Sequence, residues 1–342
     1  MPSYRIASNL VMVSTCATSF CTDFFFSHWV LSAYLYSECG AIQLSSNNLT
    51  KINVDLNLAI SLVRSQFPRW ADLPVKPVVS SGTVNALFRL GDEMVIRLPY
   101  RESAVQFPDK EHQWLPKLAP HLSLSVPVPL EKGRPESDYP WLWSIYSWLE
   151  GEDGWIQPIE DLAQAAIDLA GFITNLQHID PSDGPRHGIH NNFRGEPLAD
   201  RDPLVRSAIE ELGDRIDSRR VTKAWDLALK QPLQYKDLWI HGDLQPGNLL
   251  TQCGKLTAVI DFGLLGVGDP ASDLLPAWNL FTRDSRRVFR DAIQVDDATW
   301  IRGQGWALYQ ALLALAYYWD TNQVMVRMSQ RIIREILNDR SA

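Results

Sequence analysis

One short stretch of the chain combines the residue types that bind metal ions and move protons. It reads WIHGDLQPGNLL over residues 239–250 and contains His241, Asp243 and Asn248 between two apolar segments. A further acidic residue, Asp261, follows Asn248 by 13 positions, directly after the apolar run KLTAVI. Two carboxylates and an amide oxygen make a hard, oxygen-rich ligand set, which suits Mg²⁺ better than Zn²⁺.

These side chains need a scaffold that brings them to one place. We expect a short strand at the end of the quoted stretch and a second strand over residues 255–260, joined by a tight turn at 253–254. Pairing of the two strands would place Asp243, Asn248 and Asp261 at one end of a hairpin. Mg²⁺ held by so few protein ligands completes its shell with water and substrate phosphates, so the pattern favours a phosphorylated co-substrate.

Two kinds of pattern divide the rest of the chain. Residues 76–149 read as an antiparallel sheet with one inserted helix, preceded by a helix over 53–67 that stops at Pro68. Beyond residues 147–154, apolar residues recur at helical spacing, apart from an irregular segment over 181–203. The expected strands of the sheet are ALFRL (86–90), MVIRL (94–98), 125–133 and 139–149, with the helix near 110–119. The expected helices of the second region cover 159–176, 204–230, 270–281, 285–293, 298–318 and 324–338.

The composition is that of a globular protein. The chain has 342 residues, of which 46% are hydrophobic and 21% charged, enough to bury a sizeable core. The net charge of −8 argues against a nucleic-acid partner, which needs a basic surface. The apolar run from Trp306 to Trp319 is shorter than the roughly 20 residues that a membrane span requires, so it predicts a buried helix and no membrane partner.

Residues 1–48 differ from the rest of the chain. They hold three of the four cysteines but only three charged residues, Arg5, Asp23 and Glu38. A signal peptide is one interpretation, but the apolar run LVMVSTCA is short and no small-x-small cleavage site follows it. We favour an irregular extension that the fold does not need. Because Cys253 is the only cysteine beyond it, no disulfide framework is implied, which suits a reducing cytoplasm.

The spacing of the quoted stretch is that of the kinase catalytic loop, H-x-D-x-x-x-x-N, followed by D-F-G at Asp261. With HGDLQPGNLL, VIDFG and GDPASDL, the chain resembles the aminoglycoside phosphotransferase family, whose fold is that of the protein kinases. The resemblance runs from about residue 50 to 338. It implies an α+β, bilobal fold, with a small antiparallel β-rich N-lobe over 49–149 that binds nucleotide. A larger, mainly helical C-lobe over 150–342 would carry catalysis and substrate binding, and residues 1–48 would lie outside the fold.

The resemblance assigns a role to each residue of the loop. Asp243 would be the catalytic base for the hydroxyl that receives the phosphate, and Asn248 and Asp261 would hold Mg²⁺. His241 would support the loop, and Asp273 would brace it from below. The alternative is an ordinary polar turn without chemistry.

The nucleotide-binding side departs further from the kinase pattern. Ser81, Gly82 and Thr83 stand where a loop should cover the phosphates, without a G-x-G-x-x-G motif, although such a turn still offers backbone N–H groups. Arg97 occupies the place of the phosphate-binding lysine, and Glu111 fits the glutamate that pairs with this cation. Arginine is not equivalent to lysine, so this departure puts the phosphate-binding role of Arg97 in question.

The base of the nucleotide is expected against the backbone of Ser147, Trp148 and Leu149, at the junction of the lobes. Backbone contacts leave no residue pattern, so both ATP and GTP stay open as the co-substrate. Four tryptophans near this junction, Trp141, Trp143, Trp148 and Trp155, are interpreted as core residues, with stacking on a sugar or base as the alternative.

Asp269 precedes Pro270 and has the features of a helix N-cap.

Only 12 residues separate Asp261 from Asp273, so an activation segment that docks a protein substrate does not fit, and Gly242 stands where kinases have arginine. Both features favour a small-molecule acceptor. Acidic residues that could bind the amines of such an acceptor, with solvated surface as the alternative, are Glu152, Asp153, Glu196, Asp200 and Asp202.

The sequence thus predicts a Mg²⁺-dependent phosphotransferase with an alcohol group as acceptor. It would move the γ-phosphate of ATP or GTP to a hydroxyl of an aminoglycoside-like molecule, which would confer antibiotic resistance. One alternative is a kinase of the same fold for a macrolide, a choline-like amine, a sugar or another metabolite. The other is a nucleotide-binding pseudo-enzyme.

Overall fold

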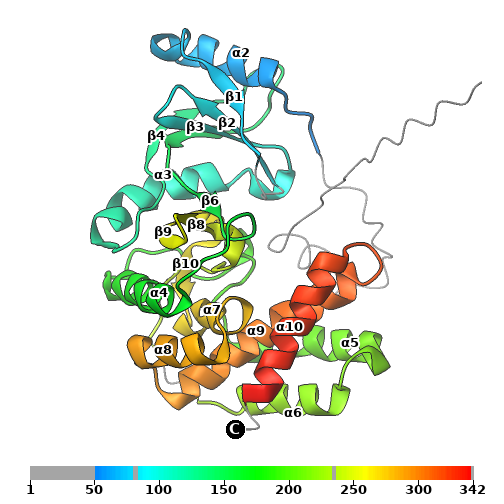
Figure 1. Cartoon of the computed structure of the whole chain (residues 1–342). Helices are drawn as coiled ribbons and strands as arrows, with labels where there is room; N and C mark the ends of the chain where they lie inside the picture. Colours follow the sequence, from blue (N-terminus) through cyan, green and yellow to red (C-terminus); the bar gives the residue numbers. More distant parts are fainter. Residues whose placement is uncertain (1–50, 80–83, 233–235, 340–342) are drawn as a thin grey trace, which may run out of the picture.

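The computed structural model describes residues 51–79, 84–232 and 236–339. The expectations for residues 1–48 and for Ser81, Gly82 and Thr83 lie outside the described residues. Elements α2, α3 and β1 to β5 form one part of the molecule, called the N-lobe here. Elements β6 to β10 and α4 to α10 form the other, the C-lobe, and its helix α6 lies at the end of the molecule opposite the N-lobe sheet (Figure 1). This is the α+β, bilobal, kinase-like architecture that the sequence predicts.

The N-lobe is built on a five-stranded antiparallel sheet in the order β1-β2-β3-β5-β4. Side chains on one face of this sheet, such as Phe88, Ile96 and Ile145, pack with Ala59 and Leu62 of α2 in one apolar core. Since successive strand residues point to opposite faces, Arg97 projects from the other face. The N-lobe elements are α2 (Leu56–Gln66), β1 (Val75–Pro77), β2 (Asn85–Leu90), β3 (Met94–Pro99), α3 (Phe107–Leu118), β4 (Pro129–Gly133) and β5 (Trp143–Ser147).

Local sequence explains where these elements begin and end. Helix α2 starts where Asp55 accepts a hydrogen bond from the Leu58 N–H (2.8 Å), and it stops before Pro68, as predicted. The strands predicted over 125–133 and 139–149 are shorter than expected. Prolines have no N–H for a strand ladder, and they occur at the start of both segments, at positions 127, 129 and 140, which confines pairing to β4 and β5.

The C-lobe contains two small β arrangements in addition to its helices. The predicted hairpin is present: β8 (Leu249–Gln252) pairs with β9 (Lys255–Val259), and both turn residues, Cys253 and Gly254, have positive φ. Strand β6 (Glu152–Asp153) extends this hairpin, and β7 (Leu238–Ile240) pairs with β10 (Gly266–Gly268). The helices are α4 (Leu162–His178), α5 (Asp202–Leu212), α6 (Ser218–Leu229), α7 (Pro276–Asn279), α8 (Arg283–Ile293), α9 (Asp297–Tyr318) and α10 (Gln323–Asp339).

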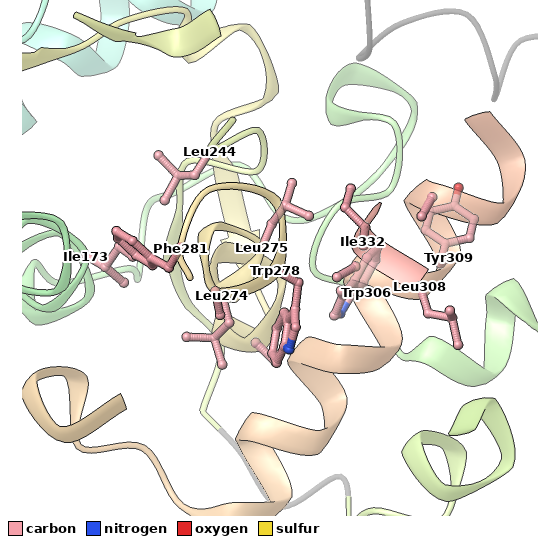
Figure 2. Close-up of a cluster of buried hydrophobic side chains, with 14 of the residues drawn as sticks. Ile173, Leu244, Leu274, Leu275, Trp278, Phe281, Trp306, Leu308, Tyr309 and Ile332 are labelled. Atoms are coloured by element: carbon pink, nitrogen blue, oxygen red, sulfur yellow. The ribbon is translucent and has the colours of Figure 1, made fainter. Parts of the chain in front are cut away.

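The core of the C-lobe surrounds α9. Figure 2 shows Trp306 of this helix near Trp278 and Leu275, with Leu244 and Phe281 in the same cluster. Leu244 directly follows Asp243, so the candidate catalytic loop is anchored in this core. Helix α9 includes most of the apolar run that the sequence predicts to be a buried helix. Within the described residues, no helix combines the length and apolarity needed to cross a membrane.

Two helical predictions were wrong in detail. The pattern over 204–230 is broken into α5 and α6, because Gly213 takes a left-handed φ of 49° and Asp217 caps the new helix by accepting from the Arg220 N–H (3.0 Å). The pattern over 270–281 is a 3₁₀ turn, Pro270–Leu274, followed by the short α7. Pro276 lacks an N–H and begins α7, which separates the two pieces.

Asp269 forms a buried ion pair in addition to its predicted capping role. Its Oδ1 accepts from the Ala271 N–H (3.0 Å), as an N-cap does. Its Oδ2 accepts from Nε of Arg302 (2.8 Å), and its Oδ1 from Nη2 of the same residue (3.2 Å). Both side chains are almost completely buried, so the pair joins α9 to the turn that follows β10 in a region of low dielectric.

This burial predicts a large loss of stability when the cation is removed. In Arg302→Met, the carboxylate of Asp269 stays buried without its ion-pair partner, which costs about 3–5 kcal/mol in the free energy of unfolding. Urea denaturation measures this quantity. Arg206→Met is the matched control: Arg206 pairs with Asp202 and Asp226 at the surface, so its loss should cost less than about 1 kcal/mol. Equal losses in the two variants would contradict this account.

Candidate active site

The backbone of the predicted catalytic loop is held by one buried carboxylate. Asp273 accepts from the His241 N–H through Oδ2 (2.7 Å) and from the Gly242 N–H through Oδ1 (2.8 Å). Burial raises the pKa of Asp273 to about 7, although these two N–H groups and Arg194 favour its charged form. Gly242 has a φ of +82°, and a Cβ there would lie 2.7 Å from the Leu264 carbonyl oxygen. Asp273 therefore makes the bracing contacts that the family resemblance implies.

His241 is a structural part of the loop. Its Nδ1 accepts from the Asp243 N–H (3.2 Å), so the ring proton lies on Nε2, which donates to the Ile260 carbonyl (3.1 Å). Burial lowers the pKa of His241 to about 4, so the ring is neutral near pH 7. Its two ring nitrogens are thus hydrogen-bonded to the backbone of Asp243 and of Ile260, and its ring packs edge-on against Phe262.

Asp243 is oriented by two amide side chains. Its Oδ2 accepts from Nδ2 of Asn248 (2.9 Å) and from Nε2 of Gln245 (3.1 Å). The Asn248 Nδ2 also donates to the Asp243 carbonyl (2.8 Å). Because both contacts of Asn248 use the amide nitrogen, its amide oxygen is the atom left to face a cation.

Asp261 begins a 3₁₀ turn, Phe262–Leu264, directly after β9 and Ile260. Its φ is 62°, a left-handed conformation that aspartate tolerates better than most residues. The Ile260 N–H donates to the Asn248 carbonyl (2.9 Å), so the hairpin sets Asp261 beside the catalytic loop. The two predicted metal ligands thus lie at the same end of the hairpin.

Arg97 connects Asp261 to helix α3. Its Nη2 donates to Oδ1 of Asp261 (2.7 Å), and its Nη1 contacts both Glu111 oxygens, at 2.8 and 3.1 Å. The Tyr146 hydroxyl donates to Glu111 as well. Burial alone disfavours the charged guanidinium, but Glu111 and Asp261 raise the Arg97 pKa above its usual range. The pair expected between Arg97 and Glu111 is thus present, and its cation is shared with Asp261.

A cavity of about 760 Å³ lies between the N-lobe sheet and the β8–β9 hairpin. Its walls are partly apolar, with Val95 and Leu87 from the sheet and Leu250 and Ile260 from the hairpin. The predicted site residues that line it are Arg97, Ser147, Trp148, Leu149, Asn248 and Asp261. Glu111 and Asp243 lie one contact away, Glu111 behind Arg97 and Asp243 behind Asn248.

The sequence did not predict some residues of this region, and it left the interpretation of others open. Gln245 lines the cavity and orients Asp243, and its place inside the quoted motif was the available indication. Tyr146, which contacts Glu111, lies next to the predicted base-binding segment. Trp143 is a core residue as predicted, whereas Trp148 lines the cavity with the Arg89 guanidinium 3.9 Å from its ring centroid.

The acidic residues considered for an acceptor's amines have different environments. Glu196 is buried against Arg201, and burial raises its pKa to about 7. Asp202 bonds to Arg206 and to the indole N–H of Trp225. Asp153 caps its own turn by accepting from the Trp155 N–H (3.0 Å). Glu152 and Asp200 are exposed, so within this group only these two fit the solvated alternative.

Fold and site together define a phosphotransferase of the kinase type, with its candidate catalytic loop and metal ligands at the cavity between two lobes. Residues 77–312 match the model of the phosphotransferase enzyme family, so the chain belongs to this family. This confirms the resemblance found in the sequence. No curated protein matches the chain.

Solved structures with low sequence identity share the fold. A GDP complex of a mutant aminoglycoside 2'-phosphotransferase-IIIa is 20% identical, with a TM-score of 0.64 over 82% of this chain and 97% of that one. A thermostable mutant of the aminoglycoside phosphotransferase APH(4)-Ia, in a ternary complex with AMP-PNP and hygromycin B, is 19% identical, with a TM-score of 0.57 and coverage of 82% and 97%. The macrolide 2'-phosphotransferase MphH from Brachybacterium faecium, as the apoenzyme, has the same identity and coverages and a TM-score of 0.56.

The grip of Asp273 on the loop can be tested with an isosteric change. In Asp273→Asn, one oxygen becomes an NH₂ group, so a buried backbone N–H loses its acceptor and faces a donor. We expect the free energy of unfolding to fall by about 1–3 kcal/mol, measured by urea denaturation. Asp284→Asn, at an exposed position in α8, is the control and should change stability little. Unchanged stability of Asp273→Asn would show that the two N–H groups do not depend on the carboxylate.

Proposed function

We propose that the protein transfers the γ-phosphate of Mg²⁺-bound ATP or GTP to a hydroxyl of an aminoglycoside-like small molecule, with Asp243 as catalytic base. The observation that carries the proposal is the convergence of Arg97, Asn248 and Asp261 on one cavity, with Asp243 bonded to Asn248 directly behind it. Family membership supports the transfer chemistry. Cytoplasmic action and a role in antibiotic resistance are parts of the same proposal.

Asn248 and Asp261 are the residues proposed to hold Mg²⁺. An amide oxygen and a carboxylate fit this hard cation, which is commonly bound by one or two carboxylates together with substrate phosphates. Among the described residues, no group of three or more His, Cys, Asp or Glu side chains could hold a metal. The proposed site therefore depends on the nucleotide for most of its oxygen ligands. When bound, Mg²⁺ would neutralise charge on the phosphates.

The protein's own residues would mainly orient the reactants. Asp243 accepts the proton of the acceptor hydroxyl, while the oxygen of that hydroxyl forms a bond to the γ-phosphorus. The bond from phosphorus to the bridging oxygen breaks, and the nucleoside diphosphate leaves. Arg97, fixed by Glu111, offers positive charge beside the transferred group. Gln245 and Asn248 keep the Asp243 carboxylate in one orientation.

The nucleoside is assigned to the same cavity. Ser147, Trp148 and Leu149 form its wall at the junction of the lobes, where the base would bond to the backbone. The related fold occurs with GDP in one complex and with AMP-PNP in another. Both purine nucleotides are therefore proposed as candidates, to be compared directly. A macrolide is the second candidate acceptor, favoured by the likeness in fold to the macrolide phosphotransferase MphH.

The proposal predicts acceptor-dependent turnover that requires Asp243. Wild-type protein is incubated with MgATP or MgGTP and with aminoglycosides, macrolides, choline-like amines and sugars, and phosphorylated products are identified by mass spectrometry. In Asp243→Asn, kcat should fall about 10²- to 10⁴-fold, because the base is lost. Asp284→Asn again serves as the exposed control and should keep full activity.

A wild-type rate retained by Asp243→Asn would remove this residue from the chemistry. If nucleotide binds but none of the acceptors is phosphorylated, the protein is a nucleotide-binding pseudo-enzyme and the proposed transfer is wrong.

The metal assignment predicts a change in the Mg²⁺ requirement. Removal of divalent ions with EDTA should abolish turnover, and added Mg²⁺ should restore it. In Asp261→Asn, the Mg²⁺ concentration for half-maximal rate should rise at least about tenfold, because a charged ligand becomes neutral. The rate is measured against free Mg²⁺ at saturating nucleotide. Asp153→Asn, which alters a carboxylate at the cavity wall, should leave the half-maximal concentration unchanged. The same requirement in wild type and Asp261→Asn would reject Asp261 as a ligand.

A further inference from the structure

A buried lysine next to Glu111 has no part in the site described so far. Lys110 lies on α3 with 9% of its surface exposed. Its Nζ is 3.0 Å from the His190 carbonyl oxygen, 3.1 Å from the Leu265 carbonyl oxygen and 3.3 Å from His190 Nδ1. All three acceptors belong to the C-lobe, so this N-lobe helix is tied across the lobe boundary.

The three acceptors match the three donors of an ammonium group. The Nε2 of His190 donates to the Arg186 carbonyl (2.7 Å), which leaves a lone pair on Nδ1 to accept from Lys110. Burial lowers the His190 pKa, in agreement with this neutral form. The amine of Lys110 is thus surrounded by groups that accept and do not donate.

Burial of an ammonium group at this position costs free energy that an apolar side chain would not cost. Two backbone carbonyls and a neutral ring replace water around it, and among the described residues no carboxylate lies within ion-pair distance of Lys110. Burial lowers its pKa to about 7, against the attraction of Glu111 and Asp261. A methionine or leucine would occupy the same volume without this cost.

Lys110 and Glu111 together hold both ends of the turn that begins at Asp261. Glu111 fixes Arg97, which bonds to Asp261 at the start of the turn. Lys110 bonds to the carbonyl of Leu265 at its end. Between them, Gly263 lies against the Phe107 ring of the same helix, so closely that a Cβ would stand 2.9 Å from it. Helix α3 thus contacts the turn directly at Gly263 and Leu265, and it reaches Asp261 through Arg97 of β3.

This turn needs external support. Asp261 has a left-handed backbone, which is unfavourable for a residue with a side chain and persists when the surroundings over-determine it. The turn also has to present the Asp261 carboxylate within the narrow distances of Mg²⁺ coordination.

We propose that Lys110 is a positioning residue: it fixes the turn 261–265 to α3. This contact keeps the Asp261 carboxylate and Arg97 at fixed positions relative to the bound metal and nucleotide. The inference rests on the proposed role of Asp261 as a metal ligand. Because Glu111 and Lys110 both lie on α3, a tilt of this helix would shift Arg97 and Leu265 together. The nucleotide would still bind in the cavity, but the displaced turn would hold Asp261 away from the metal and slow the transfer.

The experiment compares wild-type protein with Lys110→Met, Lys110→Arg and Lys117→Met. Lys117 is the matched control, because it lies on the same helix with its ammonium exposed over the Trp114 ring. We measure kcat, the KM for the acceptor and for the nucleotide, and hydrogen exchange of backbone amides in peptides that span residues 255–266.

In Lys110→Met, kcat should fall about 10- to 100-fold, as for other residues that orient a metal ligand, while the acceptor KM changes less than about twofold. Amides of 261–265 should exchange faster. Lys110→Arg keeps donors for two carbonyls and should recover most of the rate. Lys117→Met should match wild type in both measurements.

A second variant covers the case in which Lys110→Met does not fold. His190→Ala removes one of the three acceptors and leaves the lysine in place. It should lower kcat about 3- to 10-fold and speed exchange over the same amides.

Wild-type exchange over 261–265 in a folded Lys110→Met would overturn the proposal, and so would faster exchange with unchanged kcat. Hydrogen exchange does not depend on phosphate transfer. A wild type without transferase activity would therefore refute the proposed function, while the exchange data still decide whether Lys110 holds the turn.

Discussion

The site depends above all on one guanidinium shared by two carboxylates. Arg97 of β3 bonds to Glu111 of α3 and to Asp261 of the turn after β9, so the N-lobe and the C-lobe meet in a single ion chain. Glu111 is 1% exposed, and a charge that far from water is stable only while it keeps its partners. Separation of the lobes would break the Arg97–Asp261 pair and leave Arg97 with Glu111 as its remaining ion-pair partner. The chain of ions therefore favours one docking of the lobes and with it one shape of the cavity.

Arginine gives this interaction a geometry that lysine would not give. Its planar fork directs Nη1 to Glu111 and Nη2 to Asp261, so it sets the spacing between helix and turn as well as the charge. The alternation of side chains along β3 explains why residue 97 can reach Glu111 and Asp261. Ile96 belongs to the core beneath α2, and its neighbour Arg97 must then face the cavity. The departure from the kinase pattern thus replaces a point charge with a rigid spacer.

What the sequence predicted well depends on neighbours along the chain. The hairpin after Asn248, its turn and the end of α2 before Pro68 follow from local rules, and family motifs supplied the candidate residues of the loop. What it missed is decided by tertiary contacts. The partners of Lys110 lie 80 and 155 positions away, and Glu196 is buried only because Arg201 and the surrounding helices cover it. The burial of these two charged residues therefore could not be predicted from the charge and spacing of residues in the sequence.

The two halves of the candidate site are held from opposite sides. The loop of Asp243 rests on the C-lobe, through the bonds of Asp273 to its backbone and through Leu244 in the core (Figure 2). The turn of Asp261 shares that core through Phe262 and Leu265, and α3 contacts it from the N-lobe side through Phe107 and Lys110. The distance between base and metal ligand is therefore set by the hairpin together with the position of α3 on the C-lobe, and catalysis is sensitive to shifts of about 1 Å in such distances. Substitutions on the buried side of α3 should consequently slow transfer more than they weaken nucleotide binding, even where they touch neither substrate.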